Sequence, residues 1–583
     1  MTQPPTRVSH RARTILAIAS VAVALAAADT YVVVLALTDM MAGVGVTIDA
    51  LQKATPIISG FLLGYIAMLP LIGRIADLVP RQRVLQLCLA IFIVGSAVTA
   101  LATDLPVLVG GRVVQGIGGG GLVPATLALV ADLWPVGRRG TPLGVVGAVQ
   151  ELGSVVGPAL GAAILMVAQW RAIFWLNALA GVVLSVALFV LSRPRHPLRT
   201  AQPPPHLRNS EEMAGTGASP TTRRGWFPPA VLTLGLGLLL LAIWAPPALV
   251  TSVALGGPFV PLGSSSDVLA TPIGVAASVV TLLGLGLVGH AAWPVLRHAD
   301  LPGAFLLGGA LGCVILTFAS ADPETEVIGP LGYSLLPAAA VLAGLYVWRH
   351  RRAAEPLIPR GVVRARVPWA LLVSLLTGAA LVAVIVGVPL LSRLTVSPDQ
   401  TIAAFELIKF LIAVPLGAVL GGWLLRWLGD GAVAGAGMAL AAVVLLFAGS
   451  WGRGSLDSAG GTIGLLLIGL GVGLALAPVN NAALADAPEE AHGTASALVV
   501  VARMVGMVVG LAVLTAIGLH RYYQQVAALP DPTDVDALID AAITQVQTML
   551  LGASVAAALA AIACLALDLR RRGHAVERTS ALL

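Results

Sequence analysis

The sequence predicts an all-α membrane protein, and its composition is the first reason. Hydrophobic residues make up 58% of the 583 residues and charged residues 11%, whereas a soluble globular chain carries about a quarter charged residues. Mean hydropathy is +0.94, and the apolar residues gather in runs that are long enough to cross a bilayer, about 20 residues. These observations exclude a soluble enzyme, a disordered protein and, despite a pI near 9.6, an ordinary nucleic-acid-binding protein.

Sixteen apolar runs are candidates for membrane-spanning helices. In chain order they are residues 15–38, 55–76, 84–103, 105–131, 141–167, 172–192, 229–252, 269–292, 303–319, 334–348, 370–392, 402–427, 433–450, 461–486, 493–519 and 546–569. They form groups of six, four and six. Sixteen spans are favoured; if two runs of the middle group do not cross the membrane, fourteen spans remain and the two termini stay on the same side.

Arginine residues fall in alternate loops between these runs, which sets the predicted orientation. They occur before the first run, at 81–83, 138–139, 193–224, 297 and 349–366, and in the tail at 570–572. Because positively charged loops stay in the cytoplasm, both termini are predicted to be cytoplasmic. The first run is long and no cleavage site of small residues follows it, so it is not predicted to be a cleaved signal peptide.

The chain divides into five predicted segments. Residues 1–192 and 369–583 form six-helix bundles, 193–228 is a cytoplasmic linker rich in Pro, Ser and Arg, 229–292 is an inserted extra helix pair, and 293–368 is a linker helix pair with a basic loop. Two six-helix blocks on either side of a linker are typical of the pseudo-symmetric halves of a secondary transporter.

Four ionisable residues lie deep inside predicted spans: Asp29, Arg112, Glu151 and Arg503. A charged side chain at such a depth costs about 3 kcal/mol or more unless it is paired, so it marks a functional site by default. We predict that Asp29 pairs with Arg112 and carries protons. We also predict that Glu151 and Arg503 meet across the two halves in one conformation and separate in another.

Two further charges, Glu406 and Lys409, share a span of the second half and are three residues apart. This spacing lets them pair on one face of a helix. Lys409 either takes part in transport or simply neutralises Glu406, and the sequence favours neither alternative.

The loop after the second run resembles the signature loop of the major facilitator superfamily, a large family of secondary transporters. The matching residues are Gly73, Asp77, Arg81 and Arg83, whereas Leu78 and Pro80 depart from the usual Arg and Gly. Asp77 is placed to accept backbone N–H bonds from the N-terminus of another helix, where the dipole favours an anion. Span four likewise resembles the R-x-x-Q-G pattern of this family, beginning at Arg112.

Span five carries a stripe of small residues: Gly153, Gly157 and Gly161, with Pro158 beside them. Glycines four residues apart line one helix face and let another helix approach closely, and the proline predicts a kink. The stripe resembles the antiporter motif of drug/proton exporters, so it favours export over uptake. The next stretch, from Trp170 to Asn177, resembles the start of span six in the fourteen-span exporters of this type.

Taken together, the motifs of both six-helix blocks resemble mycobacterial-type exporters of triacylglycerides and drugs, a group that acts beside a periplasmic lipid-carrying lipoprotein. The resemblance implies the major facilitator fold, location in a bacterial inner membrane, a monomer, and proton coupling through Asp29, Glu151, Arg112 and Arg503. It implies no cofactor other than the proton gradient, no metal and no nucleic-acid partner. It does not cover 229–292, and at Lys409 it would have an apolar residue.

Three other functions are alternatives to a proton-coupled lipid exporter. A multidrug/proton antiporter shares every motif. A membrane-embedded enzyme, such as an acyltransferase, would need a nucleophile or metal cluster, but the nine histidines are scattered in loops and helix ends. In a scaffold without transport, charges inside the membrane would cost free energy and serve no function.

The stretch 520–545 predicts helices that extend beyond the outer face of the membrane. The helix that begins at 493 can continue to about Leu529, and a second helix is predicted to start with Asp531 as N-cap and Pro532 in its first position. This second helix carries an apolar stripe with helical spacing. It either forms a stiff hairpin that packs on itself or a periplasmic ramp that passes a lipid to a carrier protein.

Overall fold

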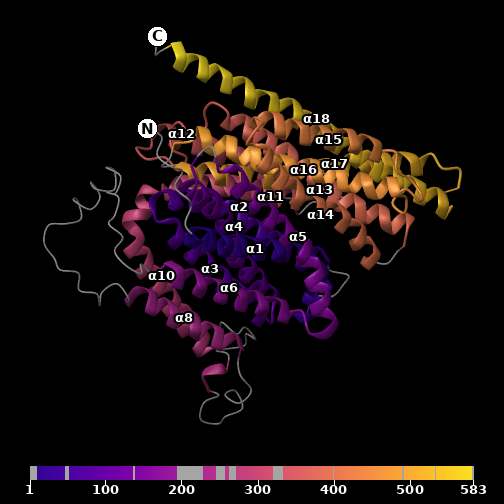
Figure 1. The fold of residues 1–583 in the computed structure, drawn as a ribbon. Coiled ribbons are helices and arrows are strands. Elements are labelled where there is room, and N and C mark those ends of the chain that lie inside the picture. Colours follow the sequence, from indigo (N-terminus) through magenta and orange to yellow (C-terminus); the bar gives the residue numbers. More distant parts are fainter. Residues whose placement is uncertain are drawn as a thin grey trace. The chain divides into compact units, whose positions relative to one another are not determined.

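The computed structural model describes residues 10–45, 51–135, 138–192, 227–244, 257–260, 271–319, 332–397, 400–488, 491–531 and 534–580. In these residues the chain forms sixteen α-helices and one short 3-10 helix, with no strand (Figure 1). The predicted all-α fold is therefore confirmed.

The first six helices are α1 (His10–Gly43), α2 (Leu51–Leu78), α3 (Arg81–Leu101), α4 (Leu105–Leu133), α5 (Gly140–Val167) and α6 (Arg171–Ser192). The middle helices are α8 (Phe227–Trp244), η3 (Gly257–Phe259), α10 (Pro272–His298), α11 (Leu301–Ala319) and α12 (Gly332–Arg352). The last six are α13 (Val367–Thr395), α14 (Gln400–Leu424), α15 (Asp430–Ala448), α16 (Ala459–Asp486), α17 (His492–Ala527) and α18 (Val535–Ser580).

Each of the sixteen predicted apolar runs overlaps one of these α-helices. Twelve helices in the described part of the chain contain a segment that is long and apolar enough to cross a membrane. Whether the chain crosses fourteen or sixteen times stays a prediction.

The predicted start of the last helix is wrong by a few residues. The helix begins at Val535, and the Asp534 carboxylate accepts hydrogen bonds from the backbone amides of Asp536 and Ala537 at 3.0 and 3.3 Å. Asp534 rather than Asp531 is the capping carboxylate because it directly precedes the helix, where its oxygen can reach amides two and three residues further on. Pro532 lies outside the described residues.

The chain separates into two compact units. One contains Val186–Leu296, and within it α8 and α10 pack closely because Gly284 faces the Leu232 backbone and Gly235 faces Thr281. The other unit contains the rest of the chain, Met1–Ser185 and Arg297–Leu583, and holds the features described below.

Within the larger unit, the first and last groups of helices pack in the same pattern. In the first group α1 packs on α5, α2 on α4, and α3 on α4; in the last group α13 packs on α17, α14 on α16, and α15 on α16. Glycines permit the close approach in both groups, because Gly116 of α4 lies against the Phe61 backbone and Gly469 of α16 against the Phe410 backbone. The repeated pairing agrees with two related halves.

The two halves contact each other where α2 ends and α17 begins, and we call this the Asp77 end. There α2 packs on α17 and α5 packs on α14. A Cβ on Gly140 of α5 would lie 2.7 Å from the carbonyl oxygen of Gly422 of α14, so at this point the two backbones touch. Gly73 of α2 makes a similar approach to Gly493 of α17, where a Cβ would lie 2.8 Å from the carbonyl oxygen.

Candidate functional site

Asp29 of α1 and Arg112 of α4 form the predicted ion pair. Arg112 Nη1 lies 2.5 Å from Asp29 Oδ2, and each residue is only 1% exposed. Two helices that are distant in sequence are thereby joined by a pair of opposite charges in the centre of the first half. Removing one partner of such a buried pair is strongly destabilising, by about 3–5 kcal/mol, because the other charge stays buried without compensation.

Polar side chains from three further positions complete this pair. Gln115 Nε2 and Asn177 Nδ2 donate to Asp29 Oδ1 at 2.9 and 2.6 Å. Gln115 also accepts from Arg112 Nη1 at 2.7 Å through Oε1 and donates to Ser96 Oγ at 2.8 Å. The carboxylate of Asp29 is therefore held by three donors from α4 and α6.

The guanidinium of Arg112 is also held from its other side. Its Nε donates to the carbonyl oxygen of Ile57 at 3.3 Å, and its centre lies 4.4 Å from the centroid of the Phe61 ring. A proton bound to Asp29 would remove the negative charge that balances Arg112.

The small-residue stripe of α5 packs directly against the helix that carries Asp29. Gly153 and Gly157 face the carbonyl oxygens of Ala24 and Ala28, and Gly161 faces the side chain of Val32. Any larger side chain at these positions would collide with α1. The surroundings of the Pro158 side chain lie outside the described part of the chain. The stripe therefore sets the distance between α1 and α5 next to Asp29.

Glu151 of α5 and Arg503 of α17 come together across the two halves, as predicted for one conformation. Arg503 Nη1 donates to Glu151 Oε1 at 3.3 Å, and the two residues are 6% and 8% exposed. The pair lines a cavity of about 190 Å³ between the halves. The walls come from α1, α2, α5, α13 and α17 and are mostly apolar, with Phe61 and Met507 among them.

Asp77 closes the contact between α2 and the N-terminus of α17. Its two carboxylate oxygens accept from the backbone amides of Gly493 and Thr494 at 2.6 and 2.9 Å, and from Thr494 Oγ1 at 2.7 Å. This is the predicted interaction with the amides of a helix N-terminus. Arg81 lies 4.0 Å from Asp77 and 3.2 Å from Asp132, whereas Arg83 is exposed.

Glu406 and Lys409 pair within α14. Lys409 Nζ donates to both carboxylate oxygens of Glu406 at 2.7 Å. The Lys409 side chain is 30% exposed and the Glu406 side chain 9%. Lys409 lies on the same helix face as Phe405 and Ile412, which are 62% and 47% exposed. The pair is local to one helix, so it does not link the halves.

Sequence reasoning missed two groups of polar residues. Gln115 and Asn177, which hold Asp29, were not assigned to it. They belong to the sequence patterns that begin at Arg112 and Trp170, and their spacing from these residues is the signal that could have identified them. The second group lies at the Asp77 end, where Arg366 binds Asp430 at 2.8 Å and Asp486 at 2.7 Å. Among the described residues, no group of three or more His, Cys, Asp or Glu side chains is placed to hold a metal ion.

The sequence is similar to a known protein family and to named relatives. The sequence profile of the Major Facilitator Superfamily matches residues 19–331, more than half of the chain. A triacylglyceride transporter of Mycolicibacterium hassiacum is 35% identical over 548 residues, which cover 91% of this chain and 85% of the relative. A triacylglyceride transporter of Mycobacteroides abscessus is 34% identical over 555 residues, 92% of this chain and 90% of the relative.

Two solved structures share the fold at low sequence identity. The human organic anion transporter MFSD10 superposes with a TM-score of 0.55 at 15% identity, covering 96% of this chain and 100% of that one. The proton:xylose symporter XylE, bound to 6-bromo-6-deoxy-D-glucose, superposes with a TM-score of 0.53 at 12% identity, covering 95% of each chain.

Proposed function

The chain belongs to the Major Facilitator Superfamily and is a membrane transporter rather than an enzyme, and we propose that it exports a triacylglyceride-like lipid from the bacterial inner membrane by proton-coupled alternating access. The names of its relatives support the lipid substrate. The apolar walls of the cavity beside Glu151 and Arg503 support it as well, because an acyl chain needs apolar contacts.

The observation that carries the proposal is the single hydrogen bond between Glu151 and Arg503. It joins the two halves at a point that faces a cavity, so it can break when the halves move apart at this level. We propose that it acts as an ion lock: it forms when the halves meet and opens when substrate or a proton takes the place of one partner.

The Asp29–Arg112 pair lies within one half, and we assign proton coupling to it. A carboxylate that is buried with three hydrogen-bond donors, one of them its counter-charge Arg112, has two defined states, ionised and paired or protonated and released. Because Gly157 of α5 packs against Ala28, the residue before Asp29 on α1, a shift of α1 on protonation would reach α5, the helix that carries Glu151. This chain of contacts connects the proposed proton site with the proposed lock.

A multidrug/proton antiporter is the alternative function, because the same cavity and the same charges would serve an apolar drug. We further propose that both termini are cytoplasmic, that the protein acts as a monomer, and that a periplasmic lipid-carrying lipoprotein receives the substrate. The carrier and the side of export follow from the family resemblance and from the arginine-rich loops.

The deciding experiment is transport by the purified protein in sealed liposomes. A fluorescent triacylglyceride and a cationic drug dye are each measured with and without a pH gradient. The proposal expects lipid movement that rises with the gradient and collapses when a protonophore is added. Gradient-driven movement of the dye without any movement of the lipid would assign the antiporter function instead.

A further inference from the structure

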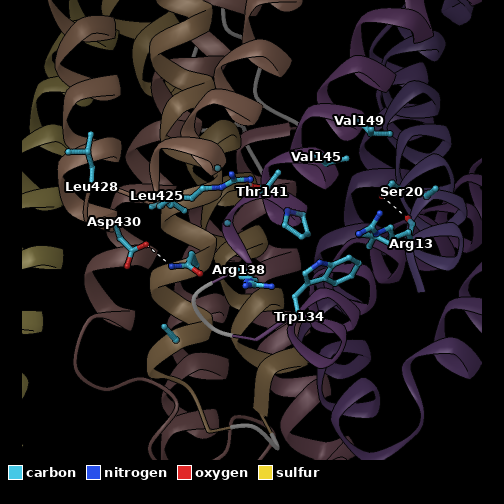
Figure 2. A pocket seen from close by; sticks show the side chains of 18 of the residues that line it. Arg13, Ser20, Trp134, Arg138, Thr141, Val145, Val149, Leu425, Leu428 and Asp430 are labelled. Atoms are coloured by element: carbon cyan, nitrogen blue, oxygen red, sulfur yellow. Dashed lines mark hydrogen bonds between the residues drawn. The ribbon is translucent and has the colours of Figure 1, made fainter. Parts of the chain in front are cut away.

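A second and larger cavity opens at the Asp77 end, outside the central charges described above. It has a volume of about 1200 Å³ and lies between the two halves (Figure 2). One wall comes from the start of α1, the α4–α5 connection and the start of α5. The other wall comes from the ends of α14 and α16 and the residues before α13 and α15.

The lining of this cavity is electropositive. It contains four arginines, Arg13, Arg138, Arg366 and Arg426, against two carboxylates, Asp430 and Asp486, which gives a net charge of +2. Arg366 already binds both carboxylates. Within the described part of the chain, the other three arginines have no carboxylate partner. Arg426 donates only to Thr141 Oγ1, at 3.2 Å. Within the residues that the structure describes, three exposed arginines therefore line one cavity without an ion pair to a carboxylate.

One part of the lining is apolar. Along α1 and α5 it is formed by Leu16, Val21, Val145 and Val149, and Trp134 lies beside Arg138 (Figure 2). Val21 and Val145 are 50% and 39% exposed, so this wall offers apolar surface rather than a closed core. A basic rim over an apolar wall fits an amphiphile with an anionic head, in which the charge meets the arginines and the chain lies along the valines.

Next to Arg138, the basic residue at the α4–α5 connection, the side chain of Arg139 is buried and hydrogen-bonded. Arg139 is 6% exposed, and it donates to the carbonyl oxygens of Trp134 and Ala131 at 2.9 and 2.7 Å. It thereby ties the α4–α5 connection to the C-terminal end of α4, where a cation also offsets the helix dipole. The neighbouring Arg138 lines the cavity directly beside this anchored residue.

We propose that this cavity is a binding site for an acidic phospholipid of the surrounding bilayer, whose phosphate is held between Arg13 and Arg138 of the first half and Arg426 of the second. A triacylglyceride is neutral and has no anionic group that could pair with these three arginines, so the site takes a ligand distinct from the proposed substrate. Because the phosphate contacts both halves beside the Gly140–Gly422 approach, the lipid stabilises the arrangement in which the halves meet at the Asp77 end.

The test is native mass spectrometry of the full-length protein released from nanodiscs that contain equal amounts of phosphatidylglycerol and phosphatidylcholine. The wild-type protein should retain phosphatidylglycerol in preference. The triple variant R13Q/R138Q/R426Q should lose that preference by at least about tenfold, since each basic side chain near an anionic headgroup contributes about fivefold. The matched control is R297Q/R351Q/R352Q, which removes three exposed arginines that do not line the cavity and should bind as the wild type does.

Thermal unfolding in detergent gives a second measurement that does not depend on release of the protein from nanodiscs. Added dioctanoyl phosphatidylglycerol should raise the midpoint of thermal unfolding of the wild type and of the control variant in detergent, but not that of the triple cavity variant. Equal retention by the two variants, or an equal rise in their midpoints, would overturn the proposal. Displacement of the retained lipid by millimolar inorganic phosphate would overturn the lipid assignment in favour of a free anion.

Discussion

The ionisable side chains of this transporter differ in how many partners each has inside the protein. Asp29 accepts from three side chains and shares its charge with Arg112, whereas Glu151 has one hydrogen bond, to Arg503. A group with many partners needs a specific chemical event, such as protonation, to release it. A group with one weak contact can separate when its helix moves. The contrast favours a proton site at Asp29 and a lock at Glu151.

The substitution Asp29→Asn tests the proton site. The amide keeps the size of the carboxyl but carries no negative charge and binds no proton, so we expect gradient-driven transport to be abolished. The protein should still be produced, with a lower midpoint of thermal unfolding because Arg112 loses its counter-charge. Transport into liposomes with and without a pH gradient measures this. Asp39→Asn, an exposed position on the same helix, is the control and should transport normally. Full gradient-driven activity of the Asp29 variant would remove this residue from the coupling mechanism.

A double-mutant cycle on Glu151→Gln and Arg503→Gln tests the lock. Residues in one ion pair show coupling energies of about 0.5–3 kcal/mol, so the double variant should be much less impaired in transport than the sum of the single variants. Initial transport rates of the four proteins give the coupling. Additive effects would mean that the two side chains act separately.

At the scale of helices, glycine decides which elements approach each other. The stripe on α5 lets α1 come close enough for Gly157 to face the Ala28 carbonyl, one residue before Asp29. The sequence predicted this stripe, because a spacing of four residues places glycines on one face. It could not predict that the partner is α1, because helix pairing depends on tertiary packing that no local pattern records.

The substitution Gly157→Val measures that packing. The added side chain collides with the Ala28 backbone, and overpacking of this kind costs about 1–3 kcal/mol, so the midpoint of thermal unfolding should fall. Gly147→Ala on the same helix is the control, since its Cβ would lie 3.9 Å from Ala418, an ordinary contact. If both variants unfold at the wild-type temperature, the stripe does not set the distance between α1 and α5.

The extended helices α17 and α18 allow a second prediction for whole elements. The start of α18 is fastened to the α15–α16 connection, since Arg453 pairs with Asp536 and Asp540 at 3.0 Å. Val535 is 67% exposed, whereas Ile543 is 5% exposed and belongs to the core, so only the outermost part of the predicted apolar stripe is free for a ligand. A hairpin that simply packs on itself and a ramp for lipid both remain compatible with this arrangement.

Removing two turns from each helix, residues 521–527 and 535–541, distinguishes the two. If the extension is a ramp that passes lipid to a carrier, transport of a fluorescent triacylglyceride should fall more than efflux of a drug dye, because a dye can leave without a carrier. Both substrates are measured on the same preparation. Equal losses, or no loss, would reject the ramp.

At the scale of the whole molecule, each predicted apolar run overlaps a helix of the described residues in the predicted order, because a continuous apolar run has few alternatives to a helix in a bilayer. The charged residues inside spans were found for the same reason, since they stand out against hydrocarbon. Gln115 and Asn177 were not assigned to Asp29, because a neutral polar residue in a span has no unique partner until helices are packed. The start of α18 was predicted a few residues too early, because Asp531 and Pro532 match the pattern of a helix start as well as Asp534 does.

The segment 229–292 provides the last prediction, at the scale of the whole chain. Its helices α8 and α10 belong to the compact unit Val186–Leu296, and up to residue 292 the described part of both helices contains no Asp, Glu, Lys or Arg. We propose that this pair is not part of the transport path and that transport depends instead on the charges in the two six-helix halves.

Joining residue 228 directly to residue 293 removes two predicted spans and leaves the termini on their original side of the membrane. The shortened protein should therefore insert and fold, and gradient-driven lipid transport should persist at a rate comparable to that of the full chain. Size-exclusion chromatography and thermal unfolding report folding, and the liposome assay reports transport. If the shortened protein is well folded but no longer transports, the pair contributes to substrate passage, and its uncharged surface would then be part of an apolar path.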